Sequence, residues 1–524
     1  MQLDATKLKT ADATVLDYIK EIQNNYEQRI KELEFKNLKL EEENNLLLYK
    51  RFARSAEQLI ADKKQPLLFA EEGTATSTEK KNIEFIEVPP HSRSKKGRKA
   101  LSDIIERRIK IIDIREEEKT CACGVKLVKI GEETSERLII VPASIYVEKI
   151  VRPKYACRCC EGTEDEGKNT VRIAPVEPSI IPRSIVSPGL LSTIITQKYE
   201  MHLPFFRQEK QFRSIGITIS RQDMSNWQQK TYTALEPLFK LLKETVKSGP
   251  VIQMDETTVQ VMGEENRDDT RKSYMWLARD GPPEKTVVWY EYHKTRGSKN
   301  AINFLHGYSG YLQTDGYEGY DAAVKELPGV IHVGCMAHSR RYFFEAAKVA
   351  DQSAAAEEGL NHIKKLYVIE KVLRDKYPLD EQRKMFVRVR QLCVWRPLKE
   401  FKEWLLKLND EVPPTLLLGK AIHYSLAQWE KLVRYLENSY LTPDNNAAEN
   451  AIRPFVLSRK NWLFCKSPDG ADSSCGMFTL IETAKQNGLV PFKYLMTLFE
   501  KTPLAKTPDD WEKLLPWNII CPKN

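Results

Sequence analysis

The order of strands and helices after residue 250 constrains this chain more than any other feature. Apolar and polar residues alternate in PVIQMDETTVQVM, SYMWLARDG and KTVVWYEYH, which predicts a meander of three strands. A helical pattern follows in SKNAINFLHGY, then a strand in GYLQTDGYEGY that ends at Asp315, and then a strand in GVIHVGC that leads into the helix MAHSRRYFFEAA. The predicted order is therefore βββαβαβα.

A meander followed by strands that alternate with helices forms a mixed sheet, which is the ribonuclease-H-like topology. In that arrangement the first and fourth strands lie side by side, so Asp255 in the first strand lies next to Asp315. The stretch LTPDNNAAENAIRPF supplies a third acid, because its turn residues cap a helix that begins near Asp444 and carries Glu449. We therefore expect residues 249 to 465 to form a core in which the three acids meet.

Three carboxylates are an oxygen-only ligand set, which suits Mg²⁺ or Mn²⁺. A pair of such ions about 4 Å apart activates an attacking hydroxyl group and stabilises the leaving oxygen of a phosphodiester. Arg453 lies one turn after Glu449, where it would hold a phosphate, although Pro454 weakens extrapolation along the helix. Lys460 is a candidate contact to a DNA backbone. For both basic residues a solvated surface position is the competing interpretation.

Residues 351 to 440 separate the last predicted strand from the helix of Glu449. They have a helical pattern rich in Lys and Glu, and we interpret them as a helical insertion in the core. They contain Trp395, Trp404 and Trp429. Buried tryptophans usually fill a core, and stacking on a nucleic-acid base beside the cleavage site is the alternative.

Residues 14 to 60 contain neither Gly nor Pro and are rich in Leu, Glu, Lys and Asn, which predicts one long helix. A heptad stripe runs along this helix with asparagines at core positions, which favours a parallel coiled-coil dimer. A single amphipathic helix packed on its own domain is the alternative. The stripe residues expected at the dimer interface are Leu33, Asn37, Leu40, Asn44 and Leu47.

Residues 61 to 100 shift in composition to Lys, Pro, Thr, Ser and Gly, and they include the basic run HSRSKKGRK. This composition predicts a linker with little structure of its own. The basic run is either a solvated tether or a non-specific contact to DNA phosphates.

Five of the ten cysteines lie between residues 121 and 160, which in a large chain without a secretion signal favours metal binding over disulfides. The segments TCACGVKL and CRCCEG flank a β-rich stretch, so four thiolates would meet across a hairpin in the tetrahedral set of a structural zinc site. Reduced buried thiols are the competing interpretation. We predict a zinc-ribbon-like β module over residues 101 to 175, with the ligands Cys121, Cys123, Cys157 and Cys160.

Residues 185 to 248 have a helical pattern. Within them RSIGITISRQDMSNWQQKTY contains a helix, a turn with Gly and a second helix that begins with Ser. This arrangement is typical of a DNA-binding helix-turn-helix and also of ordinary helical hairpins.

Composition and charge exclude some classes of protein. The 524 residues carry 81 Lys and Arg against 73 Asp and Glu, a net charge of +8 that alone barely favours nucleic acid. No apolar targeting segment begins the chain and no window is long enough to cross a bilayer, so we expect a cytoplasmic protein without a membrane partner.

Taken together, these segments resemble transposases of the insertion sequence 66 family over nearly the whole chain. The resemblance is carried, in order, by YKRFARSAEQL, RPKYACRCC, HLPFFRQEKQFRSIGITISRQDMSNW, LQTDGYEGY, HVGCMAHSRR, DNNAAENAIRPFVLSRKNWLF and IETAKQNGLVPFKYL. One departure is the single residue between the cysteines of CAC, where zinc knuckles commonly have two.

The resemblance implies the catalytic triad Asp255, Asp315 and Glu449. It also places Cys335 and His338 in a Cys-x-x-His signature that occurs in several related transposase groups. We interpret Cys335 as a buried strand thiol and His338 as a residue that orients the active site.

The resemblance further implies an amino-terminal zipper, a zinc-finger-like DNA-binding module, a helix-turn-helix-like region, the catalytic core and a small carboxy-terminal domain over residues 470 to 520. We therefore expect a multidomain α/β protein that works as a homodimer in the cytoplasm, associated with the nucleoid. Its DNA partners would be the terminal inverted repeats of its own element and a target, sometimes with small accessory proteins of the same element.

The sequence thus predicts an Asp-Asp-Glu transposase that cleaves DNA and transfers strands with the help of divalent metal. Two rival interpretations remain open. The first is a DNA-binding protein that keeps the zinc and helix-turn-helix modules and never cuts. The second is a ribonuclease-H-like nuclease or resolvase that hydrolyses nucleic acid without strand transfer.

Overall fold

The computed structural model describes residues 13–52, 145–156, 171–280, 285–348, 353–377 and 383–520. The chain divides into two compact units, which are treated separately below. The larger unit comprises residues 1–71 and 178–521, and the smaller comprises residues 72–177 with 522–524.

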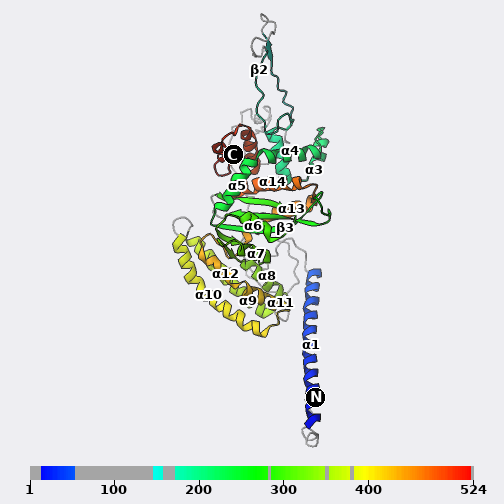
Figure 1. Ribbon diagram of the computed structural model, residues 1–524, viewed down its shortest axis with the longest axis vertical. Helices are drawn as coiled ribbons and strands as arrows, with labels where there is room; N and C mark the ends of the chain where they lie inside the picture. The colour runs from blue at the N-terminus through cyan, green and yellow to red at the C-terminus, as the bar shows by residue number, and fades with distance from the viewer. Residues whose placement is uncertain are drawn as a thin grey trace, which may run out of the picture. The chain divides into compact units, whose positions relative to one another are not determined.

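A mixed sheet with the strand order β5-β4-β3-β6-β7 forms the centre of the larger unit (Figure 1). Its strands are β3 (Val251–Val261), β4 (Lys272–Asp280), β5 (Val288–His293), β6 (Gly310–Gln313) and β7 (Val330–Val333). The first three strands pair antiparallel, whereas β6 pairs parallel with β3, and β7 pairs parallel with β6. The predicted meander and the predicted order of elements are both confirmed.

Two short helices connect the parallel strands, α6 (Ser298–Leu305) before β6 and α7 (Glu318–Lys325) before β7. The helix α8 (Met336–Ala346) follows β7. A short strand, β8 (Phe464–Cys465), pairs parallel with the far end of β3. This pairing anchors the chain directly after the helix that carries Glu449.

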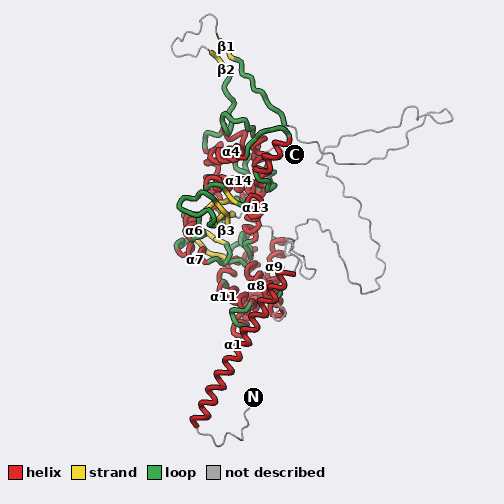
Figure 2. Tube along the Cα trace, turned by 90° about the vertical axis from the view of Figure 1, so that its right-hand side faces the viewer, coloured by secondary structure: helices red, strands yellow, loops and turns green. Residues whose placement is uncertain are grey.

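Two long helices pack on the sheet, α13 (Asn446–Trp462) and α14 (Pro468–Gln486) (Figures 1 and 2). α13 buries Ala448, Ile452 and Phe455. α14 lies along β5, where the hydroxyl groups of Thr479 and Thr483 accept hydrogen bonds from strand N–H groups at 3.0 and 3.1 Å. The strand edge is thereby hydrogen-bonded by a helix, which protects it from pairing with another chain.

The helices that follow α8 form a second hydrophobic core. They are α9 (Ser353–Lys376), α10 (Arg383–Glu411), α11 (Leu417–Ala427) and α12 (Trp429–Val433). Trp404 and Trp429 pack against Phe401 in this core, with ring centroids 6.1 and 5.8 Å apart. Trp395 differs from both, because it is 71% exposed on α10.

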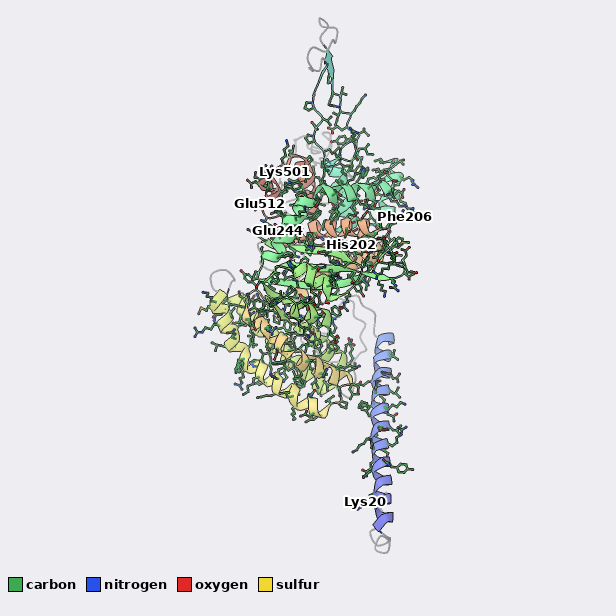
Figure 3. All side chains as sticks on the ribbon, viewed as in Figure 1. Lys20, His202, Phe206, Glu244, Lys501 and Glu512 are labelled. Carbon is green, nitrogen blue, oxygen red and sulfur yellow. The ribbon has the colours of Figure 1, made fainter. Side chains whose placement is uncertain are left out.

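Four helices precede the sheet, α2 (Pro188–Tyr199), α3 (Phe205–Ser214), α4 (Arg221–Ala234) and α5 (Glu236–Ser248). As predicted, α3 and α4 are separated by a turn that contains Gly, and Gly216 has a φ of +82°. Ser220 caps α4 through a reciprocal pair of hydrogen bonds with Asp223. Phe206 is about half exposed on α3 (Figure 3).

Residues after α14 form α15 (Pro491–Lys501) and α16 (Pro508–Glu512). Leu495, Leu498 and Phe499 of α15 are fully buried and belong to the same hydrophobic core as the sheet. The last helices of the described chain therefore share their packing with the strands.

The predicted amino-terminal helix is present as α1 (Ala13–Phe52), and the remainder of the predicted segment lies outside the described residues. Leu33, Leu40 and Leu47 are 48%, 53% and 64% exposed. Asn37 and Asn44 are also exposed. The heptad stripe is thus uncovered in a single chain. Among the described helices, none is long and apolar enough to span a membrane.

The smaller unit contains one described strand pair, β1 (Lys154–Ala156) with β2 (Val171–Ile173), joined antiparallel. The expected β-rich stretch is shorter than predicted, because residues 145–153 form no regular strand. The predicted zinc ligands Cys121, Cys123, Cys157 and Cys160 and the predicted linker lie outside the described residues.

Candidate active site

The register between β3 and β6 brings Asp255 and Asp315 to the same level of the sheet. Gln253 is paired with Gln313 in the parallel ladder, and their side chains share a buried hydrogen bond of 2.8 Å. Both strands run in the same direction, so the residues two positions further along each are Asp255 and Asp315. A short parallel pairing thereby places two carboxylates together that are far apart in the sequence.

A buried hydrogen-bonded chain holds the backbone next to Asp315. The hydroxyl group of Thr314 lies 2.8 Å from Nε2 of His332 on β7, and it donates to the backbone oxygen of Asp315 at 2.9 Å. Nδ1 of His332 lies 2.7 Å from the carboxylate of Asp321. Because Thr314 and His332 are almost fully buried, this chain fixes the position where β6 ends.

The electrostatic environment of Asp255 is unusual for a carboxyl group. Burial, and after it the negative charges of Glu256, Glu449 and Asp315, together raise its pKa to about 7. Like charges disfavour ionisation of a neighbour when they lie close together. The three predicted acids are thus near enough to interact, and a cation placed among them would relieve their repulsion.

The start of α13, the helix that carries Glu449, is attached to β3. The side chain of Asn445, the residue before the helix, donates a 2.8 Å hydrogen bond to the backbone oxygen of Met254. Its backbone N–H points at Sγ of Cys335, 3.2 Å away. Glu449 lies one turn further along α13, so these bonds fix the start of the helix that carries it.

The helix start differs from the expected cap in one respect. The side chain of Asn445 does not cap α13, because it is hydrogen-bonded to β3 instead. A carboxylate oxygen of Asp444 accepts the N–H of Asn446 at 3.1 Å and satisfies part of the helix end. Pro454 lies inside α13, and the helix continues past it to Trp462.

Two residues of α8, His338 and Arg341, lie next to the carboxylate of Glu449. Nδ1 of His338 lies 3.7 Å from Oε1 of Glu449, and a guanidinium nitrogen of Arg341 lies 3.5 Å from Oε2. Burial lowers the pKa of His338, although the charge of Glu449 opposes this effect. His338 is thus a neighbour of Glu449, and its predicted role in orienting the site stays a prediction; Arg341 was not predicted.

The residues present fit a divalent metal ion. Oε1 of Glu449 is a buried oxygen without a hydrogen-bond partner, and buried polar atoms are almost always satisfied. Asp255 and Asp315 would supply further oxygen donors, the kind that Mg²⁺ and Mn²⁺ prefer, although the three carboxylates are not grouped within 4.8 Å of one another in this structure. Metal binding would pair these oxygens and lower the pKa of Asp255.

A second acid on β3, Glu256, was not predicted. Its side chain is 2% exposed and accepts hydrogen bonds from Nε of Arg296 at 2.6 Å and from the hydroxyl group of Tyr320. Arg296 also lies 3.9 Å from Asp315 and covers the ring of Tyr317. Because neighbouring strand residues point to opposite faces, Glu256 steadies Arg296 and Asp315 from the side of the sheet away from α13.

A second unpredicted residue is Arg390 of α10, whose side chain is fully buried. It donates hydrogen bonds to the backbone oxygens of Tyr435, Asn438 and Leu441 and forms a 3.2 Å ion pair with Glu370. These carbonyls belong to the segment that leads directly into α13. The helical insertion therefore holds the chain that positions Glu449.

The other predicted basic residues lie on the surface. Arg453 and Lys460 are both exposed on α13. Arg459 is more buried, and it donates to the hydroxyl groups of Thr257 and Thr258 on β3 at 3.2 and 3.0 Å. The predicted phosphate contact of Arg453 stays a prediction.

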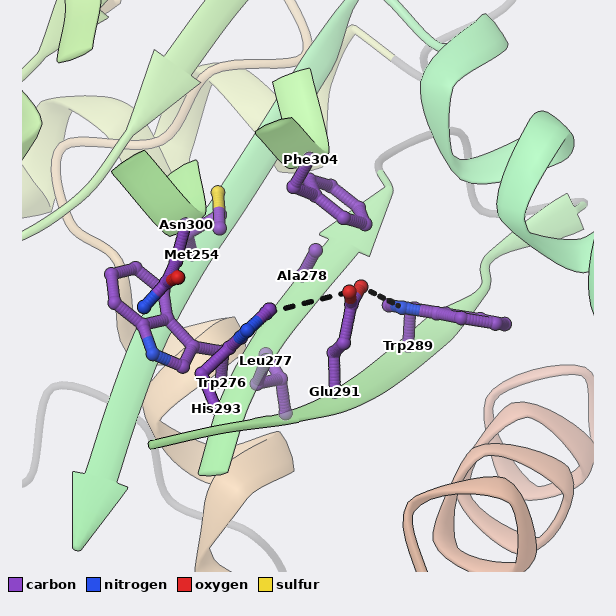
Figure 4. Close-up of a pocket in the computed structure, with 9 residues that line it drawn as sticks. All are labelled: Met254, Trp276, Leu277, Ala278, Trp289, Glu291, His293, Asn300 and Phe304. Carbon is purple, nitrogen blue, oxygen red and sulfur yellow. Dashed lines mark hydrogen bonds and ion pairs between the residues drawn. The ribbon is translucent and has the colours of Figure 1, made fainter. Parts of the chain in front are cut away.

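A separate small hollow lies between the meander and α6 (Figure 4). Glu291 is its charged residue, held by Trp289 at 3.1 Å and by His293 at 3.4 Å. Burial would raise the pKa of Glu291, yet the hydrogen bond from His293 and the charge of Lys243 lower it to about 2. None of the three predicted acids lines this hollow.

Comparison with protein families identifies the class to which this architecture belongs, DNA-acting transposases with a zinc-finger module. The longest match, to residues 183–473, is described as the transposase IS66 family. Residues 118–161 match the zinc-finger binding domain of transposase IS66, and this range contains all four predicted zinc ligands. Residues 479–517 match the IS66 C-terminal element, and residues 39–109 match transposase C of IS166 homeodomain. The chain belongs to the IS66 transposase family.

Three relatives from Sinorhizobium fredii (strain NBRC 101917 / NGR234) are similar over most of their length. Uncharacterized protein y4jD is 31% identical over 77% of this chain and 79% of the relative. Uncharacterized protein y4hP is 30% identical over 81% and 77%, and uncharacterized protein y4qI is 31% identical over 82% and 78%.

Proposed function

We propose that this protein is a metal-dependent DNA transposase that binds the terminal inverted repeats of its element, cleaves DNA there and joins the freed ends to a target. The observation that carries the proposal is the convergence of Asp255, Asp315 and Glu449 from two strands and a helix. Their charges act together on the pKa of Asp255, and Oε1 of Glu449 lacks a partner. The family membership supports the same activity.

We further propose that the core has the ribonuclease-H-like topology. The support is the strand order, in which an antiparallel meander continues into parallel strands on the other side of β3. In this topology the central strand and the neighbouring parallel strand each contribute one acid. Glu449 completes the set from the helix that follows the insertion.

The proposed reaction comprises two phosphoryl transfers. In the first, water attacks the phosphodiester at the element end, which forms a new P–O bond and releases a 3′-hydroxyl group. In the second, that hydroxyl group attacks a target phosphodiester and releases a target 3′-oxygen. Bound Mg²⁺ or Mn²⁺ would activate the attacking oxygen and stabilise the leaving one.

Individual residues would have separate roles in this reaction. Asp255, Asp315 and Glu449 would hold the metal, with Asp255 shared between two ions. Arg341, 59% exposed beside Glu449, would be free to contact a phosphate once Glu449 turns to the metal. His338 would orient Glu449.

The remaining modules would bring DNA to this site. The cysteines Cys121, Cys123, Cys157 and Cys160 would hold zinc in a DNA-binding module, and the stripe on α1 would pair two chains. α3 presents exposed Arg207, Lys210 and Arg213, which suits DNA phosphates. We propose the predicted domain boundaries unchanged, a homodimer that works on the nucleoid in the cytoplasm, and accessory proteins of the same element as partners.

Purified protein incubated with a labelled element-end duplex, a target plasmid and Mn²⁺ tests this proposal. We expect a joined product whose label migrates with the plasmid and which disappears when a chelator replaces Mn²⁺. Hydrolysed ends without joined product would favour the nuclease alternative. Binding without any product, also with accessory proteins present, would favour the non-catalytic DNA-binding alternative.

A further inference from the structure

We propose that Cys335, His338 and Glu449 form a binding site for Zn²⁺ at the edge of the acidic site. The occupied site would withhold Glu449 from Mg²⁺ or Mn²⁺. The existence of the site does not depend on the proposed function, whereas its effect on DNA joining does.

The three side chains already point at one another. One ligand atom from each, Sγ, a ring nitrogen or a carboxylate oxygen, lies within 4.8 Å of the other two. Around a tetrahedral zinc ion such atoms are about 3 to 4 Å apart, given bond lengths of about 2.0 Å to nitrogen or oxygen and 2.3 Å to sulfur. Side-chain rotations that move the ligand atoms by about 1 Å would therefore bring all three to the separations found around zinc.

Two helix starts hold this arrangement together. Cys335 precedes α8 and His338 lies in its first turn, while Glu449 lies in the first turn of α13. The N–H of Met336 donates to the backbone oxygen of Pro443 at 2.8 Å, which ties the two starts together. The ligands thus come from anchored backbone, as metal sites require.

Two of the three donor atoms lack the hydrogen-bond partners that a site without metal would need. Nδ1 of His338 and Oε1 of Glu449 are buried without hydrogen bonds, and the 3.7 Å between them is too long for one. The third, Sγ of Cys335, is fully buried and accepts a contact from the N–H of Asn445 at 3.2 Å. A cation among these atoms would replace the missing interactions.

The chemistry of the donors selects the ion. Sulfur, imidazole and carboxylate together are a zinc set, whereas Mg²⁺ avoids thiolates and prefers oxygen alone. On binding, a Zn–S bond forms while the thiol proton of Cys335 passes to solvent, and neutral His338 binds without losing a proton. A water molecule would fill the fourth position on the exposed side near Arg341.

Zinc stoichiometry of the full-length protein tests the site directly. Wild type, Cys335→Ser and Cys393→Ser are stripped with chelator, reloaded with a small excess of Zn²⁺, desalted and analysed by elemental mass spectrometry. We expect Cys335→Ser to retain one ion per chain fewer than wild type. Cys393→Ser replaces an exposed cysteine and should match wild type. Equal zinc contents in wild type and Cys335→Ser would overturn the proposal.

Cobalt supplies a second readout that does not require Cys335→Ser to fold. In a variant whose five cysteines between residues 121 and 160 are serines, Co²⁺ should produce a thiolate-to-cobalt absorption band. Adding His338→Gln should remove the band while the thiol stays in place. A band that is absent from the first variant, or unchanged by His338→Gln, would contradict the site.

The joining assay then measures the consequence. Added Zn²⁺ should inhibit Mg²⁺-dependent joining by wild type and inhibit Cys335→Ser much less. If no joining occurs under any condition, the proposed function fails while the zinc content still decides the site. Equal inhibition of both proteins would show that zinc acts elsewhere.

Discussion

At the scale of single residues, Asp255 is a buried carboxyl group whose ionisation is costly. Its pKa rises from 3.8 to about 7, first because it is buried and then because other acids surround it. At pH values between these two pKa values, the carboxyl group of Asp255 keeps its proton in the folded protein and releases it in the unfolded chain. The free energy of unfolding therefore falls as pH rises from about 4 to about 7, and above 7 the whole cost is present.

Replacing this carboxylate should stabilise the metal-free protein. The shift sets an upper limit of about 4 kcal/mol, and we expect Asp255→Asn to gain about 1 to 3 kcal/mol at pH 8 because solvent and relaxation reduce the cost. At pH 5 the gain should be small, since Asp255 is already protonated. Thermal unfolding in chelator at both pH values measures this difference. The exposed Asp375→Asn serves as control, and a gain equal at both pH values would contradict the pKa shift.

The sequence predicts the acids of this site better than their partners. Asp255 and Asp315 follow from strand pattern and topology, because register places strand residues in space. Glu256 and Arg296 were missed, since alternation alone makes Glu256 an ordinary outward residue and nothing local pairs it with an arginine 40 residues away. Arg341 was missed for the same reason, because its contact with Glu449 depends on how two helices pack.

At the scale of elements, the site depends on hydrogen bonds that connect separate segments. The bond from Asn445 to β3 is one of them. Asn445→Ala removes the hydrogen bond to β3 and leaves the carbonyl of Met254 unsatisfied, so the free energy of unfolding should fall by about 1 to 3 kcal/mol. Joining activity should fall further than this loss explains, because α13 would no longer be fixed over Asp255. Asn461→Ala, at the exposed end of α13, is the matched control. A variant that joins DNA at the wild-type rate would contradict this role.

Arg390 makes the corresponding connection between the helical insertion and the segment that leads into α13. Arg390→Met removes a donor from three carbonyl groups and one of the two arginine partners of Glu370, while Arg374 still bonds to Leu441 and Glu370. We therefore expect a loss of about 3 kcal/mol in urea unfolding, at the low end for a broken buried ion pair. The added change Glu370→Leu should restore part of it by removing a buried carboxylate that has lost one of its two arginine partners. Arg396→Met removes an arginine that is 88% exposed and should have little effect. Similar losses for the two arginine variants would show that burial of Arg390 contributes nothing.

Element types were predictable where the hydrophobic period was clear, as in the meander, the helices around Gly216 and the long amino-terminal helix. Residues 145–153 have strand-like composition yet form no regular strand, because a strand needs a partner and composition does not supply one. The start of α13 was placed correctly, but the use of Asn445 was not. Its side chain can satisfy either its own helix or a neighbouring strand, and only tertiary packing decides between them.

At the scale of the whole molecule, the exposed stripe of α1 bears on how many chains work together. Leu40→Asp places a charge in the expected dimer seam and should convert dimers to monomers in light scattering coupled to gel filtration. Lys39→Asp places an aspartate on the same helix outside the seam, with an even larger change of charge, and should leave the mass unchanged. A wild-type protein that is monomeric at every concentration, or a Leu40→Asp variant that stays dimeric, would contradict the zipper.

The central claim is that three acids from separate parts of the chain form one metal-dependent site for DNA joining. The most direct measurement is the joining rate of Asp255→Asn, Asp315→Asn and Glu449→Gln beside wild type, with DNA binding measured on the same preparations. We predict that each variant binds element ends normally and joins them about 10² to 10³ times more slowly or less. A variant of any of the three acids that binds and joins DNA at the wild-type rate would contradict the claim.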